Sequence, residues 1–545
     1  MNKLRITITA VLALALAAGH TRAQQNQEND IAYYIAHAPF KMPAVTEPHF
    51  NTNVFNIKTY GAVSDGQTLN TTAFEKAITA CNAAGGGTVL IPPGLWLTGP
   101  IVLKSNVNLH AERGALITFT TNHTQYPIIN GRVQLPVSGN NLENVGITGE
   151  GIFDGGGDTW RPLKKSKAAP SLWSAMLKKG GVVSKDGDMY WPSKEGMDGE
   201  DYLKNLKGKP NLTAQDYLPA RDFLRPNMVV ITNSKNVLFD GPTFKNAPQF
   251  ALNPHGCINM IIRNVTINNE YSAQNGDGID ISECKNVLIY HCTVNAGDDG
   301  ICMKSSGKGD VLNNPALKNV IIADCIVYHA HGGFVIGSNT NGGMQNVYVT
   351  NCNYVNTDVG IRVKSSRGRG GPVHDIYIDN IFMHDILNEA ILFSTYYDEK
   401  AGTTADQKFE VNATTPQFYD FYISHVYGSG AKNAISIVGL PEMPVNHIHF
   451  SDLVLSAGKG IDLTDASDIS LKNVKVISPQ KTLITTSNAW NIDLNNISFG
   501  DNLQTFIDLK GDKSKAITVS ATNLKQIKEA VKAEAGALAS AVTIK

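Results

Sequence analysis

The chain has 545 residues and a formal net charge of -1, so it lacks the basic excess that binding to nucleic-acid phosphates requires. Charged residues make up only 17% of the sequence, and 49 glycines provide for many turns. This length allows several domains, unless the chain forms one long domain of repeats. We therefore expect no nucleic-acid partner.

Residues 1–23 have the pattern of a secretory signal peptide. Lys3 and Arg5 form a positive start, an apolar run follows, and the small residue Ala23 ends the segment. The apolar run is too short to span a bilayer, and we find no other candidate span in the sequence. We expect cleavage near Ala23, a secreted or periplasmic protein, and a lead segment at 24–51 before the main domain.

The next predicted element is an amphipathic helix within residues 71–87. Phe74, Ala77, Ile78 and Cys81 recur at helical spacing, so they share one face. The first coil of a solenoid exposes apolar side chains and a strand edge unless something covers it. We predict that this helix is the N-terminal cap.

A short pattern then recurs along the chain: Asn or Asp followed by alternating apolar residues, as in "NVLIYHC" at 286–292 and "NVIIADC" at 319–325. Between Asn236 and Asp420 the starts of these units lie 23 to 45 residues apart, a spacing typical of a solenoid. The period of two within each unit indicates a strand. We predict an all-β fold, a right-handed parallel β-helix solenoid over residues 52–520.

Two segments depart from the repeat. Residues 156–227 form an insertion between coils, and insertions in solenoids often lie at the binding face. Residues 521–545 are expected to form a helical, capping tail. The insertion carries aromatic and basic side chains that are candidates for ligand contacts: Trp160, Trp173, Trp191, Lys164, Lys165, Lys167, Arg161, Arg221 and Arg225.

The second strand of each coil brings charged residues of different coils together. In our alignment Asp277 lies one coil from Asp299, and Asp298 lies one coil from His331. Converging carboxylates repel, which raises the pKa of at least one of them and provides a proton donor near neutral pH. Flanking glycines let both adjacent aspartates face outward. The alignment rests on Gly278, Gly300, Gly333, Gly360 and Ala390, and it places Lys304, Arg362 and Lys364 on the same outer strip.

Cysteines and oxygen donors offer two weaker hypotheses about metals. The seven cysteines contain no C-x-x-C pair, and Cys292, Cys325 and Cys352 occupy the same place in consecutive coils, so we expect a ladder of buried thiols instead of a zinc site. A calcium loop remains an alternative, although the spacing does not follow the EF-hand pattern. We expect no metal and no cofactor. The candidate calcium donors are Asn275, Asp277, Asp280 and Glu283.

Four short motifs follow one another along the chain: Asn275-Gly276-Asp277, Asp298-Asp299, His331-Gly332 and Arg362-Val363-Lys364. Together they resemble the N-x-D, D-D, G-H-G and R-x-K motifs of the polygalacturonase family of glycoside hydrolases. Two residues depart from that pattern, since Gly276 stands where the family has Thr and Ala330 where it has the first Gly. Neither change removes a titrating group. The resemblance extends to "FNIKTYGAVSDG" and "AAGGGTVLIPPG" near the start of the chain.

The resemblance implies roles for these residues. Asp298 is expected to protonate the leaving glycosidic oxygen, while Asp277 and Asp299 hold and deprotonate a water, with inversion at the anomeric carbon. A catalytic separation of roughly 6.5–9.5 Å between acid and base would suit that reaction. His331 is expected to tune the acid. The residues expected to bind the substrate are Arg362, Lys364, Asn275 and Lys304.

The implied function is that of an exported, monomeric hydrolase of α-1,4-linked galacturonic acid in pectin. The insertion at 156–227 favours exo action, because a loop that closes one end of a groove turns it into a pocket for a chain end. Four alternatives remain open: a rhamnogalacturonan-type galacturonohydrolase, an endo-polygalacturonase, a pectate lyase, and a non-catalytic carbohydrate-binding β-helix.

Overall fold

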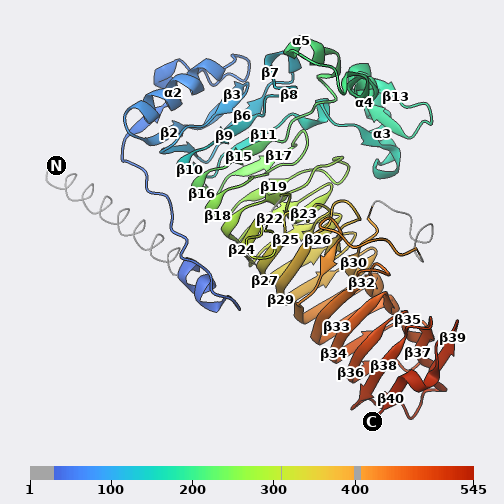
Figure 1. Cartoon of the computed structure of the whole chain (residues 1–545). Coiled ribbons are helices and arrows are strands. Elements are labelled where there is room, and N and C mark those ends of the chain that lie inside the picture. The colour runs from blue at the N-terminus through green and yellow to red at the C-terminus, as the bar shows by residue number, and fades with distance from the viewer. Residues whose placement is uncertain (1–29, 308–309, 398–406) are drawn as a thin grey trace, which may run out of the picture.

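The computed structural model describes residues 30–307, 310–397 and 407–545. They form one long right-handed parallel β-helix, along which the chain winds from the N-terminal end to the C-terminal end (Figure 1). This confirms the predicted fold class. The predicted signal peptide, residues 1–23, lies outside the described residues. Within the described part of the chain, no helix has the length and apolar character needed to cross a membrane.

Parallel strands stack coil upon coil in three stacks. Stack 1 consists of β1 (Val54–Asn56), β2 (Gly87–Ile91), β5 (Val107–Ala111), β10 (Glu143–Thr148), β16 (Lys235–Asp240), β18 (Ile258–Arg263), β21 (Lys285–Tyr290), β24 (Leu317–Ala323), β27 (Met344–Val355), β29 (Pro372–His384), β31 (Gln417–Phe418), β32 (Phe421–Val438), β33 (Val445–Thr464), β34 (Ala466–Ile477), β36 (Trp490–Phe499), β38 (Lys515–Ser520) and β40 (Val542–Ile544). Stack 2 consists of β3 (Gly94–Thr98), β6 (Ala115–Phe119), β11 (Ile152–Asp154), β17 (Thr243–Lys245), β19 (Thr266–Asn268), β22 (Thr293–Asn295) and β25 (Ile326–Tyr328), and then continues in the long strands from β27 onward.

Stack 3 carries the predicted site. Leu252 and His255 bridge β15 to β20 in this stack, where no full strand intervenes among the described residues. Its strands are β4 (Ile101–Val102), β9 (Val137–Asn140), β15 (Val229–Thr232), β20 (Ile279–Ser282), β23 (Asp299–Lys304), β26 (Gly332–Ile336), β28 (Ile361–Lys364), β30 (Glu389–Ser394), the ends of β32 and β33, β35 (Thr482–Ser487), β37 (Thr505–Lys510) and β39 (Glu529–Glu534).

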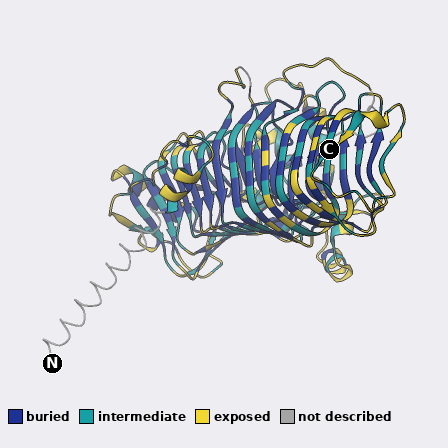
Figure 2. Cartoon of the chain, turned by 90° about the horizontal axis from the view of Figure 1, so that it is seen from below, coloured by how far each residue is buried: buried dark blue, intermediate teal, exposed yellow. Residues whose placement is uncertain are grey.

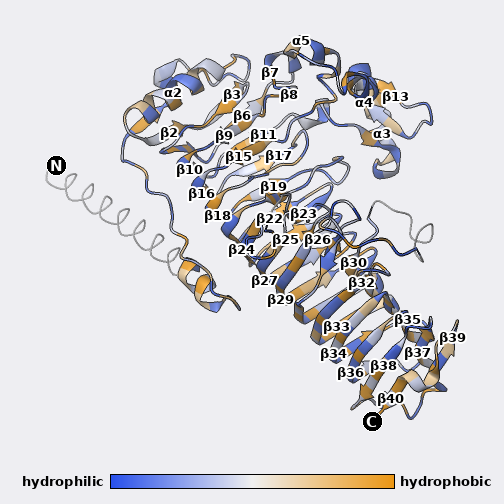
Figure 3. Cartoon of the chain, viewed as in Figure 1, coloured by the Kyte–Doolittle hydropathy of each residue, from blue (hydrophilic) through white to orange (hydrophobic). Residues whose placement is uncertain are grey.

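The core runs along the inside of the solenoid because many strands alternate buried side chains with less buried ones, as β2 does, whereas β20 and β26 are buried throughout. The alternation is visible as stripes of burial in Figure 2 and of hydropathy in Figure 3. Cys292, Cys325 and Cys352 are buried in this core, as predicted, and all seven cysteines are free. The thiols therefore serve as small apolar side chains.

The recurring Asn forms a ladder at one corner of the coils. Asn259, Asn286 and Asn319 all have a left-handed backbone, with φ between 56° and 59°. Asn tolerates this conformation better than most residues. The amide of Asn286 donates to Asn259 Oδ1 at 3.1 Å, and that of Asn319 donates to Asn286 Oδ1 at 3.0 Å. The Asn side chain of each of these coils thus forms a hydrogen bond with the Asn side chain of the next coil, which explains why these repeats begin with Asn.

Helix α2 (Thr71–Ala83) is the predicted N-terminal cap, with Phe74, Ala77, Ile78 and Cys81 buried against the first coils.

The lead segment before the cap packs against the outside of the solenoid. Its described part is helical at residues 30–37 and then extends along the outside of stack 1, where its apolar side chains cover those of the strands. The contacts in this outer cluster join Ile31, Tyr34, Met42 and Val45 to Leu238, Ile261, Leu288 and Ile321.

The insertion folds into a small separate layer beside the early coils (Figure 1). A hairpin of β7 (Ile128–Ile129) and β8 (Arg132–Val133) lies before it along the chain. Other short 3-10 helices are η1 (Ile57–Tyr60), η2 (His123–Gln125) and η6 (Ala539–Ala541). The insertion itself contains η3 (Gly157–Thr159), β12 (Leu163–Lys164), η4 (Lys165–Lys167), α3 (Pro170–Lys178), β13 (Val182–Val183), β14 (Met189–Trp191), α4 (Lys194–Leu206), α5 (Ala214–Tyr217) and η5 (Leu218–Ala220), with β12, β14 and β13 in an antiparallel sheet.

The prediction of a helical tail at 521–545 is wrong. This segment forms β39 and β40, and its helical content among the described residues is the single turn η6. Strand β39 pairs with β37, and β40 pairs with β38. The unpaired edges of the preceding strands offer backbone hydrogen bonds that outweigh the helix propensity of an Ala-, Lys- and Glu-rich sequence.

Candidate active site

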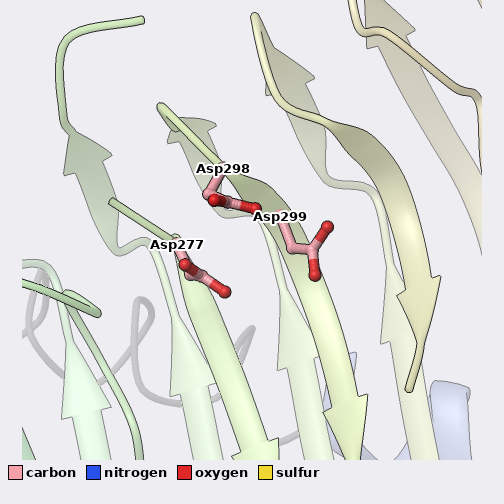
Figure 4. Close-up of side chains that lie close together, drawn as sticks. All are labelled: Asp277, Asp298 and Asp299. Carbon is pink, nitrogen blue, oxygen red and sulfur yellow. The ribbon is translucent and has the colours of Figure 1, made fainter. Parts of the chain in front are cut away.

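Three aspartates meet on the outer surface of stack 3. Asp277 lies just before β20, Asp298 just before β23, and Asp299 begins β23 (Figure 4). One oxygen of each carboxylate lies within 4.8 Å of one oxygen of each of the other two. The predicted register is confirmed, because Asp299 pairs with Gly332 and the backbone N–H of His331 donates to Asp298 O at 2.7 Å.

Glycines allow this close approach of neighbouring coils. A Cβ on Gly278 would lie 2.6 Å from Gly300 O, and one on Gly300 would lie 2.8 Å from Gly332 O. Neither Gly278 nor Gly300 has a positive φ. The glycines beside the aspartates are therefore needed for space, whereas the sequence had suggested a need for unusual backbone angles.

Asp299 is fully engaged by two cations. Lys364 Nζ donates to both of its oxygens, at 2.8 and 3.1 Å, and Arg362 Nη1 lies 3.3 Å from Oδ1. Burial raises the pKa of Asp299, but Lys364, Lys304 and Arg362 outweigh it and hold the pKa well below its usual value. Asp299 is thus ionised. Arg362 and Lys364, the expected carboxylate ligands, are paired with the protein's own carboxylate in this state.

Asp277 has a second, buried carboxylate beside it, that of Asp280, which the sequence suggested only as a candidate calcium donor. Lys304 Nζ lies 2.8 Å from Asp280 Oδ2 and 3.3 Å from Asp277 Oδ2, and the Asp280 side chain has no exposed surface. Burial and then the Asp280 charge raise the pKa of Asp277 well above its usual value. Because Lys304 holds this pair together beside Phe250, the prediction that Lys304 is a free substrate ligand is not supported.

Asp298 is the most exposed of the three aspartates and pairs with His331. His331 Nδ1 lies 3.0 Å from Asp298 Oδ1, and its Nε2 lies 3.5 Å from Asp358 Oδ2. Burial raises the pKa of Asp298, but the hydrogen bond from His331, the electrostatic effect of its ring and the charge of Lys364 together outweigh burial and lower it. The raised pKa expected from the carboxylate cluster is therefore found at Asp277, while the pKa of Asp298 is lowered.

The insertion reaches directly into this cluster. Lys167, on η4, donates to His331 Nε2 at 2.7 Å and to Gly297 O at 2.8 Å, and it lies over the ring of Tyr271. Arg225, just after the insertion's last helix, donates to Asn275 Oδ1 at 2.6 Å. Asn275 is thus held by a cation from the insertion.

Other basic and aromatic residues of the insertion have structural roles. Arg161 is buried and donates to Ala247 O and, at 3.0 Å, to Asn246 Oδ1, so it ties the insertion to the solenoid. Trp160 is buried and stacks on His123 with ring centres 3.4 Å apart. The hypothesis that these two residues contact a ligand is therefore wrong.

The calcium-loop alternative does not match the geometry. Glu283 accepts a hydrogen bond from Ser306 N and pairs with His255, so it does not join the aspartates. Within the described ranges, the one acidic group compact enough to share a cation is formed by Asp277, Asp298 and Asp299, whose charge the neighbouring Lys and Arg side chains already oppose.

Comparison with known proteins places this site in a family. Residues 219–478, which include all three aspartates, match a family described as glycosyl hydrolases family 28. The chain carries a glycosyl hydrolase family 28 domain and is a glycoside hydrolase. Residues 54–146 match a second model, described as rhamnogalacturonase A/epimerase, pectate lyase-like. Most of the insertion lies between the two matched segments.

Relatives of this chain include an exo-poly-α-D-galacturonosidase of Dickeya chrysanthemi, 27% identical over 446 residues that cover 77% of this chain and 70% of that protein. A solved structure of a hyperthermoactive exopolygalacturonase from Thermotoga maritima matches with a TM-score of 0.63 at 26% identity, covering 85% of this chain and 96% of that one. A family 28 exopolygalacturonase from Yersinia enterocolitica shares the fold, with a TM-score of 0.63, 22% identity, and coverage of 81% and 78%.

Proposed function

We propose that this glycoside hydrolase cleaves α-1,4-linked galacturonic acid in pectin, removing single units from a chain end with inversion, as an exported monomer. The names of the Dickeya and Thermotoga relatives, an exo-galacturonosidase and an exopolygalacturonase, support the substrate. The paired carboxylates with their lysine and arginine partners support hydrolysis over a lyase reaction. A rhamnogalacturonan substrate remains the closest alternative.

The observation that carries exo action is the contact of the insertion with the catalytic cluster. Lys167 and Arg225 lie against His331 and Asn275, so the insertion stands beside the reacting groups. A polymer that runs through the site in both directions needs free space on both sides. A wall on one side favours the binding of a chain end.

In the proposed reaction, Asp298 gives its proton to the glycosidic oxygen as the bond to the anomeric carbon breaks. A water held by Asp277 and Asp299 attacks that carbon and loses a proton to one of these carboxylates. Two oxygens within 4.8 Å of each other can both accept hydrogen bonds of about 2.8 Å from one water. This closest approach is shorter than the separation of roughly 6.5–9.5 Å typical of inverting enzymes, so the proposal of inversion rests on the family resemblance.

Substrate carboxylates meet several cations at this site. Arg362 and Lys364 can turn from Asp299 toward a uronate when it binds, and Arg offers it a bidentate contact. Asn275, which accepts a hydrogen bond from Arg225, can also contact a sugar hydroxyl of the substrate. Lys304 is left out of this set, because it is bound to Asp277 and Asp280.

A time course on polygalacturonic acid, with and without a chelator, tests the reaction type. We expect reducing ends to increase at the same rate in both samples, without the ultraviolet absorbance of unsaturated uronates. Absorbance that rises with product and disappears with the chelator would indicate a lyase. No release from any pectic substrate would indicate a carbohydrate-binding solenoid.

A further inference from the structure

Lys167 differs in its partners from the cations that the solenoid itself brings to the site. Lys304, Lys364 and Arg362 each pair with a carboxylate of the solenoid. Among the described residues, Lys167 has no carboxylate within ion-pair distance, and its polar contacts are the Gly297 and Tyr271 carbonyls and the His331 ring. A cation with only neutral partners is well suited to receive a carboxylate from a ligand.

The contact between Lys167 and His331 determines where the imidazole carries its proton. An ammonium group only donates hydrogen bonds, so His331 Nε2, 2.7 Å away, must be the acceptor. The ring is then neutral, and its proton is on Nδ1, which faces Asp298 Oδ1 at 3.0 Å. Asp298 Oδ1 accepts this hydrogen bond, which favours the ionised form of Asp298 over the protonated acid. The ionised form has no proton to give.

Asp358 offers the same ring a second state. Its Oδ2 lies 3.5 Å from His331 Nε2, on the side that Lys167 now occupies. If Lys167 leaves, Nε2 can carry a proton and donate it to Asp358, and Nδ1 can then accept a hydrogen bond from a protonated Asp298. The second state holds one more proton than the first, and that proton comes from solvent water. The other charged groups that act on Asp298 or Lys167 are Asp277, Asp299, Lys164 and Lys364.

We propose that Lys167 is a positioning residue that, through its contact with His331, keeps Asp298 ionised, and that a substrate carboxylate withdraws Lys167 and so allows Asp298 to take up its catalytic proton. This inference rests on the proposed function, because it assigns the carboxylate to a galacturonate unit. In this proposal the insertion, through Lys167, controls the protonation of Asp298. Asp298 therefore becomes protonated when a uronate is bound.

The free-enzyme pH profile of Lys167→Met tests the inference. The acid must be protonated to act, and removing Lys167 favours the protonated form, so the alkaline limb of kcat/KM should move to higher pH by about one unit, the lower end of the effect of a neighbouring cation. On the acid plateau, kcat/KM should fall about ten- to a hundred-fold through loss of a charge-assisted contact. Lys178→Met, exposed on α3 of the same insertion, is the matched control, and Lys167→Arg should restore the wild-type limb.

Nitrogen-15 NMR of the histidine rings tests the same point in the wild-type enzyme, with His331→Gln used to assign the signal. We expect His331 Nε2 to be unprotonated in the free enzyme and protonated at saturating galacturonate. An unchanged ring state on binding, or an unchanged alkaline limb in Lys167→Met, overturns the inference. Failure of the proposed function is a separate result, since wild-type enzyme would then release no galacturonate.

Discussion

Asp298→Asn is expected to lower kcat on galacturonan oligomers by about 10²–10⁴-fold while leaving KM within a few-fold of the wild-type value. The amide has nearly the same shape as the carboxyl group and can still accept the hydrogen bond from His331 Nδ1, 3.0 Å away. It cannot give a proton to the glycosidic oxygen. The loss should therefore appear in the chemical step and in neither folding nor binding.

Steady-state kinetics and a thermal unfolding scan of the same preparation measure this separation. Asp501→Asn, an exposed aspartate on a late coil, is the matched control and should keep full activity. Near-normal turnover of Asp298→Asn would remove Asp298 from the acid role. Asp277, whose pKa is raised, would then be the next candidate.

Lys304→Met is expected to destabilise the protein at pH 7 by about 3–5 kcal/mol, because it leaves two buried carboxylates without their counter-ion. Lys304 lies 2.8 Å from Asp280 and 3.3 Å from Asp277, and both aspartates are buried. Methionine keeps the apolar contact with Phe250, so the change isolates the charge.

The pH dependence of this loss has a definite sign. Burial raises the pKa of Asp277 and Asp280 in the folded state, and Lys304 limits that rise. Without Lys304 both pKa values should rise further. Between the unfolded pKa and the raised folded pKa, the folded state holds more protons, so stability falls as pH rises through this window.

Urea unfolding at pH 7 and near pH 4, close to the aspartate pKa of an unfolded chain, measures that dependence. The deficit of Lys304→Met relative to wild type should be large at pH 7 and much smaller near pH 4. The exposed Lys475→Met is the control and should be close to wild type at both values. An equal deficit at the two pH values would show that lost packing, and not unpaired charge, is the cause.

Much of the fold could be predicted because the coils of the solenoid carry the same short sequence pattern. Alternation of apolar residues sets each strand, and the recurring Asn sets each corner, so Ile279, Ile301, Phe334 and Ile361 could be aligned correctly from sequence alone. The C-terminal tail was mispredicted because its helix propensity is local, whereas the pairing of β39 with β37 is not.

The site was predictable where its residues follow the strand register of stack 3. The three aspartates and His331 come together as expected, since they occupy equivalent places on adjacent coils. The pairing of each Lys and Arg side chain with a particular carboxylate was not predictable, because it depends on how far and in which direction each side chain extends. Lys167 and His331 are 164 residues apart, and no repeat pattern relates an insertion to the coils it covers.

The most direct test of the account is a proton NMR time course of the wild-type enzyme acting on a galacturonic acid hexamer. Exo-acting hydrolysis with inversion predicts that the first product is free galacturonic acid, that it is released as the β-anomer from an α-linked chain, and that the pentamer is its only companion at early times. A ladder of shorter oligomers before the monomer, or a first product in the α-form, would contradict the account.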